Sequence, residues 1–182
     1  MHSTRLKNIG LLIFLVSIVL GCKQMEHLVR PTDLKSSDGK FQITVPAGWR
    51  ENKTLHEDAS IGAANTSKEV YVIVISENKS DFASDIDLDK FTEVTRTSMT
   101  SKLKSPEGTP PTPVKINGKT GRQYMLQGEG KLVKVAYLVT TVETNEQYHQ
   151  IIAWTLKSRI DQNQPVLQKV TESFRETTAA KN

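Results

Sequence analysis

The chain has 182 residues, of which 24 are basic and 20 acidic, and its formal net charge is +4. This weak, dispersed charge argues against a nucleic-acid-binding protein, and the single cysteine excludes an intramolecular disulfide. The length fits one domain that is stabilised by an ordinary hydrophobic core.

The first residues have the three parts of an export signal. Two basic residues precede an uncharged apolar run over residues 9–20, which is shorter than the roughly 20 residues of a membrane-spanning helix. The stretch Val19-Leu20-Gly21-Cys22 then resembles the lipobox of bacterial lipoproteins, in which lipid is attached to the cysteine. We therefore expect residues 1–21 to be removed and Cys22 to carry acyl chains, palmitate among them, that anchor the protein to a membrane.

The predicted location is extracytoplasmic, in the periplasm or at the cell surface. Lys23 follows the cysteine in place of the aspartate that resembles an inner-membrane retention signal, which favours the outer membrane if the host has one. Residues 22–39 contain a proline, several charges and no apolar period. We expect them to form a flexible spacer that precedes a domain over residues 40–175.

The first half of the domain predicts three strands. Apolar residues alternate over Phe41–Val45, and a proline and a glycine end that strand before Trp49, which we expect to pack in the core rather than to stack on a ligand. A weaker strand is indicated over Ala59–Asn65. Val70–Ile75 is apolar on both faces, so this strand is expected inside the sheet with material covering both sides.

A helix is predicted over residues 88–104, with Asp85 or Asp87 capping its first turn. Its apolar stripe consists of Leu88, Phe91, Val94 or Thr95, Met99 and Leu103. The proline-dense residues 105–113 follow, and we expect an exposed linker there rather than a peptide-recognition motif.

The second half predicts antiparallel strands and a closing helix. Asn117-Gly118 is the strongest hairpin signal, because both residues tolerate the positive φ of a type I′ turn. Further strands are expected over residues 122–127, 131–141 and 148–156, with turns at residues 128–130 and 145–146. The last helix is expected to open near Pro165, and residues 176–182 to form a disordered tail.

Two helices far apart in sequence, with central strands that are apolar on both faces, predict an α/β fold: a three-layer α/β/α sandwich on a mainly antiparallel sheet. Three segments and the helix end at Phe174 resemble the PsbP-like domains: Phe41-Gln-Ile-Thr-Val-Pro-Ala-Gly-Trp49, Ile116-Asn-Gly-Lys-Thr-Gly-Arg122 and Tyr148-His-Gln-Ile-Ile-Ala153. This superfamily includes the photosystem extrinsic proteins and bacterial envelope lipoproteins similar to DcrB.

The resemblance covers about Lys40 to Phe174. It implies a binding or assembly module that usually has no catalytic activity, and it carries over no catalytic residue. The positions that it matches are fold-making ones, namely Gly48, Trp49, Gly118, Gly121 and Trp154.

The sequence contains no nucleophile elbow, no glycine-rich phosphate loop and no paired-cysteine or HExxH metal motif. Asp85, Asp87 and Asp89 alternate as in a calcium loop, but Lys90 and Arg96 occupy the positions of the required glycine and glutamate. We therefore expect a capping loop at the helix N-terminus rather than a calcium site.

Two clusters leave alternatives open. His56, Glu57 and Asp58 could meet His149 across the fold, which would make a small-ligand or metal-dependent envelope enzyme using His56, Asp58 or His149. Five basic residues could gather into a patch for anionic headgroups or an acidic partner: Lys115, Lys119, Arg122, Lys131 and Lys134.

The favoured interpretation is a lipid-anchored, extracytoplasmic binding or assembly module of the cell envelope, without catalysis. We expect no cofactor, no metal and no nucleic acid. The expected partners are the membrane, through the lipid on Cys22, and a protein of the envelope.

Overall fold

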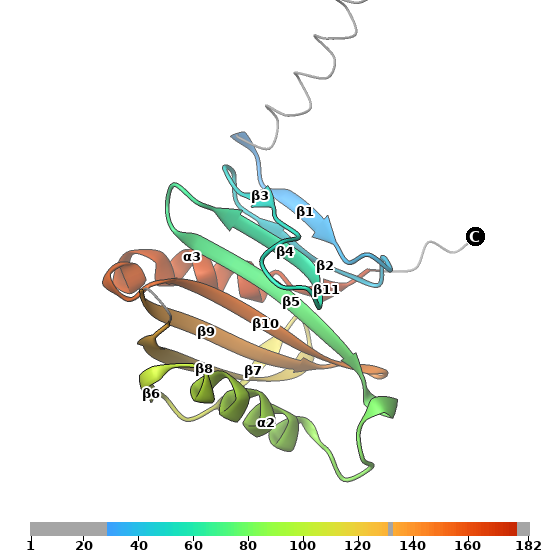
Figure 1. Cartoon of the computed structure of the whole chain (residues 1–182). Helices are drawn as coiled ribbons and strands as arrows, with labels where there is room; N and C mark the ends of the chain where they lie inside the picture. The colour runs from blue at the N-terminus through green and yellow to red at the C-terminus, as the bar shows by residue number, and fades with distance from the viewer. Residues whose placement is uncertain (1–28, 131–132, 178–182) are drawn as a thin grey trace, which may run out of the picture.

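The computed structural model of the chain describes residues 29–130 and 133–177. Its strands pair antiparallel throughout and form two sheets (Figure 1). The large sheet has the order β3 (Arg50–Glu51), β4 (Ala59–Asn65), β5 (Val70–Asn78), β10 (Gln147–Leu156), β9 (Lys134–Glu143), β8 (Lys119–Glu129) and β6 (Lys104–Gly108), and β7 (Thr112–Ile116) also pairs with β8. The small sheet has the order β1 (Thr32–Lys35), β2 (Phe41–Val45) and β11 (Arg175–Glu176).

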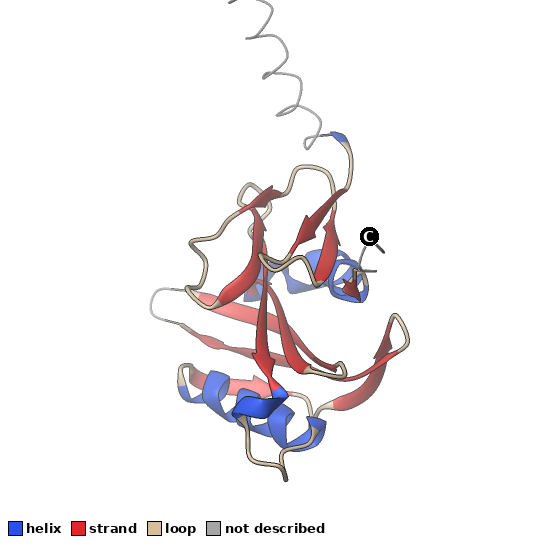
Figure 2. Cartoon of the chain, turned by 90° about the vertical axis from the view of Figure 1, so that its right-hand side faces the viewer, coloured by secondary structure: helices blue, strands red, loops and turns tan. Residues whose placement is uncertain are grey.

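Two α-helices lie entirely within the described residues, α2 (Leu88–Ser101) and α3 (Ile160–Glu172). Short 3-10 turns, η1 (Lys79–Asp81) and η2 (Lys157–Arg159), come before them in the chain. Figures 1 and 2 show the two helices on opposite sides of the large sheet. A mostly antiparallel sheet with two helices confirms the predicted α/β class.

The small sheet lies on the same side of the large sheet as α3. Phe41, Ile43 and Val45 of β2 belong to one buried core with Leu167 and Val170 of α3. The α3 side is therefore made of a helix and a sheet together, and α2 covers only part of the other side. For these two reasons the complete three-layer sandwich stays a prediction.

Strand β5 lies between β4 and β10, inside the sheet as predicted. Val70, Val72 and Val74 are completely buried on the α3 side. Ile73 and Ile75 point to the other side, where Ile75 is only partly buried. The expectation that both faces are covered is thus correct for one face and only partly correct for the other.

Two local predictions are confirmed. Asn117 and Gly118 form the hairpin turn between β7 and β8 with φ angles of 47° and 82°, both in the left-handed region. Trp49 is 3% exposed and belongs to the main core, so it packs in the interior instead of stacking on a ligand.

Both ends of the domain differ from the prediction, because they form strands. Residues 32–35, expected in the flexible spacer, are β1, and Glu176, expected in the disordered tail, belongs to β11. Asp33 of β1 accepts a hydrogen bond from Thr44 of β2 at 2.6 Å and pairs with Arg175 of β11 at 2.9 Å. Strands this short and this polar give no apolar period, which is why the sequence pattern missed them.

Three boundaries elsewhere are also corrected. Helix α2 ends at Ser101, and part of the expected linker is strand β6, where Pro106 is tolerated because β6 is an edge strand. Helix α3 begins at Ile160 and not near Pro165, because the turn η2 leads directly into it. Pro165 therefore lies inside the helix.

Candidate functional site

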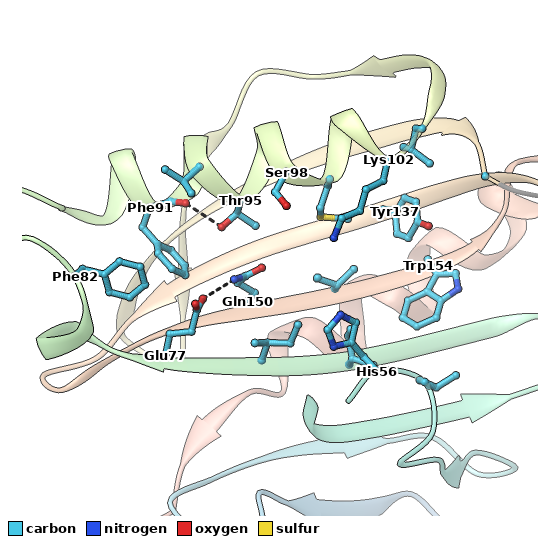
Figure 3. Close-up of a pocket in the computed structure, with 18 residues that line it drawn as sticks. His56, Glu77, Phe82, Phe91, Thr95, Ser98, Lys102, Tyr137, Gln150 and Trp154 are labelled. Carbon is cyan, nitrogen blue, oxygen red and sulfur yellow. Dashed lines mark hydrogen bonds between the residues drawn. The ribbon is translucent and has the colours of Figure 1, made fainter. Parts of the chain in front are cut away.

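A groove of about 490 Å³ lies between α2 and the adjacent face of the large sheet (Figure 3). Its floor consists of five strand residues, Ile73, Ile75, Tyr137, Ile152 and Trp154. Helix residues Phe91, Val94, Thr95, Ser98 and Met99 form one wall, and Leu55 and His56 line the opposite side. The rest of the lining consists of Phe82, Lys102, Leu103, Glu77, Gln150 and Gly130. A mainly apolar hollow with a few polar groups is typical of a small-molecule site.

The floor follows from the register of three central strands. Ile152 of β10 stands opposite Ile73 of β5 on one side and Val139 of β9 on the other. Trp154 of β10 is stacked on Tyr71 of β5 at 5.2 Å between ring centroids. Because side chains alternate between the faces of a strand, these cross-strand rows make one continuous apolar surface.

The groove stays open because α2 packs to one side of this floor. Thr92 of α2 shares a hydrogen bond of 2.6 Å with Thr141 of β9, and Phe91 is stacked on Tyr148 at 4.7 Å. These contacts hold the helix over β8, β9 and the Tyr148 end of β10, and they leave Ile75 of β5 and Trp154 of β10 only partly buried. Val94, at the lip of the groove, is consequently 59% exposed.

The N-terminus of α2 is fixed by the carboxylates that resemble a calcium loop. Asp87 is the helix cap, and it accepts a hydrogen bond from the Lys90 backbone N–H at 2.8 Å. Asp85 pairs with the Lys90 side chain, whose hydrogen bond lowers the pKa of that carboxyl group, and Asp89 pairs with Arg122. Each carboxylate therefore has a structural partner, as the capping interpretation predicts.

Charged and polar groups lie at different parts of the groove. Figure 3 shows Lys102 and His56 pointing into it from opposite walls, whereas Glu77 and Gln150 lie nearer the Phe82 end. Glu77 accepts a hydrogen bond from Gln150 at 2.8 Å. The groove is therefore polarised, with basic side chains in one part and an acidic side chain in another.

The structure does not bring the predicted enzyme residues together. His56 and Asp58 lie on the loop before β4, where the His56 Nδ1 accepts a hydrogen bond from the Asp58 N–H at 3.2 Å. His149 lies on the other side of the sheet, 1% exposed and in ring contact with Phe41 and Phe174. Within residues 29–130 and 133–177, no three His, Cys, Asp or Glu side chains are placed to hold a metal ion.

The surroundings of His149 explain its burial. Its Nδ1 is 2.8 Å from the Ser76 Oγ and its Nε2 is 3.4 Å from the Thr144 Oγ1. Burial lowers the pKa of His149 to about 4, so the ring is neutral at pH 7. His149 is thus a core residue with hydrogen-bonding partners.

The proposed basic patch does not form as one surface. Lys119 and Arg122 are each paired with a carboxylate, at 2.5 Å and 2.6 Å. Lys134 lies at the opposite end of the β8–β9 pair from Lys119, and Lys131 is outside the described residues. Lys115 donates a hydrogen bond to Thr120, so the four described positions do not present a concentrated positive charge.

The export signal and Cys22 also lie outside the described residues. In the part of the chain that the structure covers, no helix has both the length and the apolar character needed to cross a membrane.

The sequence pattern did not predict the groove, although one feature of the pattern pointed to it. The helix pattern left Val94 and Thr95 as alternatives for the buried stripe, and the structure buries Thr95 and exposes Val94. A stripe as narrow as that of α2 cannot cover the apolar face of a sheet this wide.

No protein family profile matches the sequence, and no curated protein is detectably similar to it. Solved structures nevertheless resemble the chain. The cyanobacterial PsbP of Synechocystis, CyanoP, superposes with a TM-score of 0.61 at 13% identity, over 82% of this chain and 94% of that chain. The chain has a PsbP-like fold.

Two further proteins share this PsbP-like fold. LpqN of Mycobacterium tuberculosis, described as involved in cell envelope biogenesis, gives a TM-score of 0.58 at 15% identity, over 82% of this chain and 91% of that chain. The Ran-binding protein Mog1p of Saccharomyces cerevisiae gives 0.55 at 13% identity, over 81% and 95%. At these identities the likeness establishes the fold alone.

Proposed function

We propose that the protein is a lipid-anchored, extracytoplasmic binding or assembly module of the cell envelope, and that the groove beside α2 is its binding site. The open groove carries this proposal, because an apolar hollow with a few polar groups at its edges is the usual form of a ligand site. Here Ile75 of β5 and Trp154 of β10 line the groove and are only partly buried, so a ligand or partner can reach them.

The proposed cellular location rests on the N-terminal sequence. The lipobox-like stretch that ends at Cys22 supports a lipid anchor, and Lys23 favours the outer membrane of a host that has one. LpqN, which shares the fold, is described as involved in cell envelope biogenesis, and this supports the envelope location. The described chain begins beside the small sheet, away from α2, so a tether at that end leaves the groove accessible (Figure 1).

The arrangement of the groove supports binding without catalysis. Its titratable side chains are His56, Glu77, Lys102 and Tyr137, and Glu77 is bonded to Gln150 instead of to another of these groups. Burial raises the pKa of Tyr137, which keeps its hydroxyl group protonated. No pair of them forms the nucleophile and base of a covalent mechanism. Mog1p, another protein with this fold, is described as a Ran-binding protein, which also supports a binding role.

A groove-filling substitution tests the proposed site. Ser98 is exposed on α2 and lines the groove, so Ser98→Trp should fill it without disturbing the core. We expect the purified protein to enhance the fluorescence of the neutral apolar dye Nile red, and Ser98→Trp to lower this enhancement several-fold.

Lys169→Trp is the matched control, because it adds the same side chain at an exposed position of α3. It should leave the Nile red enhancement unchanged. Equal enhancement by Ser98→Trp and Lys169→Trp, with both variants folded by circular dichroism, would show that the groove is not the apolar binding site.

A further inference from the structure

The groove is elongated along the strands of its floor. Between Gln150 and Trp154, both of which line it, strand β10 advances by about 13 Å at roughly 3.3 Å per residue. The floor between these residues is apolar, with Ile152 of β10 beside Ile73 of β5. A site of this shape suits a long, flexible apolar chain.

Lys102 supplies a cation beside this apolar floor. It is the C-cap residue of α2, where a positive charge is favoured by the helix dipole. Its side chain points into the groove (Figure 3), and no carboxylate among residues 29–130 and 133–177 is paired with it. A cation that faces an apolar groove without a counter-ion is complementary to an anionic ligand.

His56 faces the groove from the opposite wall. Its Nδ1 accepts the hydrogen bond from Asp58, so the neutral ring carries its proton on Nε2. The carboxylate of Asp58 also lies 3.9 Å from this Nδ1, so Asp58 occupies that edge of the ring. The Nε2–H is therefore the donor that is left for a ligand. Glu77, nearer the other end, would repel an acidic group and so fixes the direction in which an acidic ligand lies.

We propose that the groove binds a long-chain fatty acid, an inference that rests on the binding function proposed above. The acyl chain lies along the floor against Ile75 and Trp154, and the carboxylate is held by Lys102 with His56 donating from the opposite wall. The groove does not accept a peptide by strand addition, because β5, β10 and β9 each already pair with a neighbour on both sides.

Photolabelling tests this inference on the full-length, anchored protein. Membranes that carry it are incubated with a palmitate analogue that bears a diazirine in its chain and a terminal alkyne, and are then irradiated. We expect the label in peptides of α2 or β10. Excess palmitate should displace it at least fivefold more effectively than hexadecanol, which has the same chain without the charge.

Substitutions at the basic end provide the controls. Lys102→Gln should lower labelling about fivefold, the loss of roughly one ion pair, and His56→Gln should lower it in the same direction. Lys102→Arg keeps the charge and should keep the labelling, whereas Lys169→Gln removes a charge from the opposite side and should change nothing.

Four outcomes would each overturn the fatty-acid assignment. Hexadecanol could displace the label as well as palmitate does, or lysophosphatidic acid could displace it better. The label could also fall outside the groove, or Lys102→Gln could be labelled fully. This failure is distinguishable from failure of the proposed function. If palmitate is not held but a photoreactive residue at Val94 in the groove captures an envelope protein, the module binds a protein and the fatty-acid inference is wrong. If neither is captured, both proposals fail.

Discussion

At the residue scale, His149 shows how strongly the fold decides the chemistry of a side chain. The sequence offers it as a metal ligand beside His56 and Asp58, yet the alternation of β10 directs it to the α3 side. There it contacts Phe41 and Phe174 and is removed from solvent. Its role is therefore to complete a core, and this has a measurable consequence for stability.

That consequence is a pH dependence. Burial lowers the pKa of His149 from 6.5 to about 4 in the folded chain. Between these two pH values the unfolded chain binds a proton that the folded chain does not bind. The free energy of unfolding should therefore fall by up to about 3 kcal/mol as the pH falls from about 6.5 to about 4.

Urea unfolding of the wild type and of His149→Gln at pH 4 and pH 7 measures this contribution. The variant is expected to be less stable at pH 7 but to lose less stability on acidification, because it has no imidazole to protonate. Carboxylates that titrate in the same range affect both proteins and cancel in the comparison. An identical loss of stability in the two proteins would show that His149 does not titrate as described.

At the element scale, α2 determines whether the groove exists. Its cap at Asp87 and its contact with β9 through Thr92 place it over β8 and β9. We expect Asp87→Ala to lower the free energy of unfolding by about 1 kcal/mol, because the Lys90 N–H loses its acceptor at the helix N-terminus.

Asp85→Ala is the comparison for this prediction. Asp85 also contacts Lys90, but through an exposed ion pair that is screened by solvent. Thermal unfolding of the two variants should therefore show a clearly larger decrease for Asp87→Ala. The opposite order would mean that the ion pair, and not the cap, stabilises the start of α2.

Elements with a strong local signal could be predicted from the sequence. The apolar run of β5, the positive φ at Asn117 and Gly118, and the cap residue before α2 are each determined by residues next to one another. Strands β1 and β11 could not be predicted, because each is stable only through its pairing with β2.

The groove depends on a different kind of information. Its floor could be anticipated, since β5 and β10 are apolar on both faces. Its openness could not, because it depends on where α2 packs across the sheet, and this is set by contacts between distant residues such as Thr92 and Thr141. The failure of His56 and His149 to meet has the same origin, in strand register and not in local sequence.

At the scale of the whole molecule, the proposed lipid anchor belongs to the N-terminal end of the chain, and the groove lies on the far side of the domain from the first described strand. The anchor predicts that Cys22→Ser abolishes incorporation of labelled palmitate and leaves an uncleaved or misprocessed precursor, because the thiol that accepts the lipid is absent. Metabolic labelling followed by membrane fractionation checks this. Normal processing of Cys22→Ser with unchanged membrane retention would rule out the lipobox.

Site-specific photocrosslinking in intact cells tests the central claim most directly. A benzophenone-bearing residue replaces Val94 at the lip of the groove, or Lys169 on α3 as the control, and the mass of any adduct is determined. We expect an adduct, lipid or protein, from position 94 and none from position 169, with less adduct when Cys22→Ser removes the proposed anchor. No adduct from position 94, or the same adducts from both positions, would contradict an anchored module that binds through this groove.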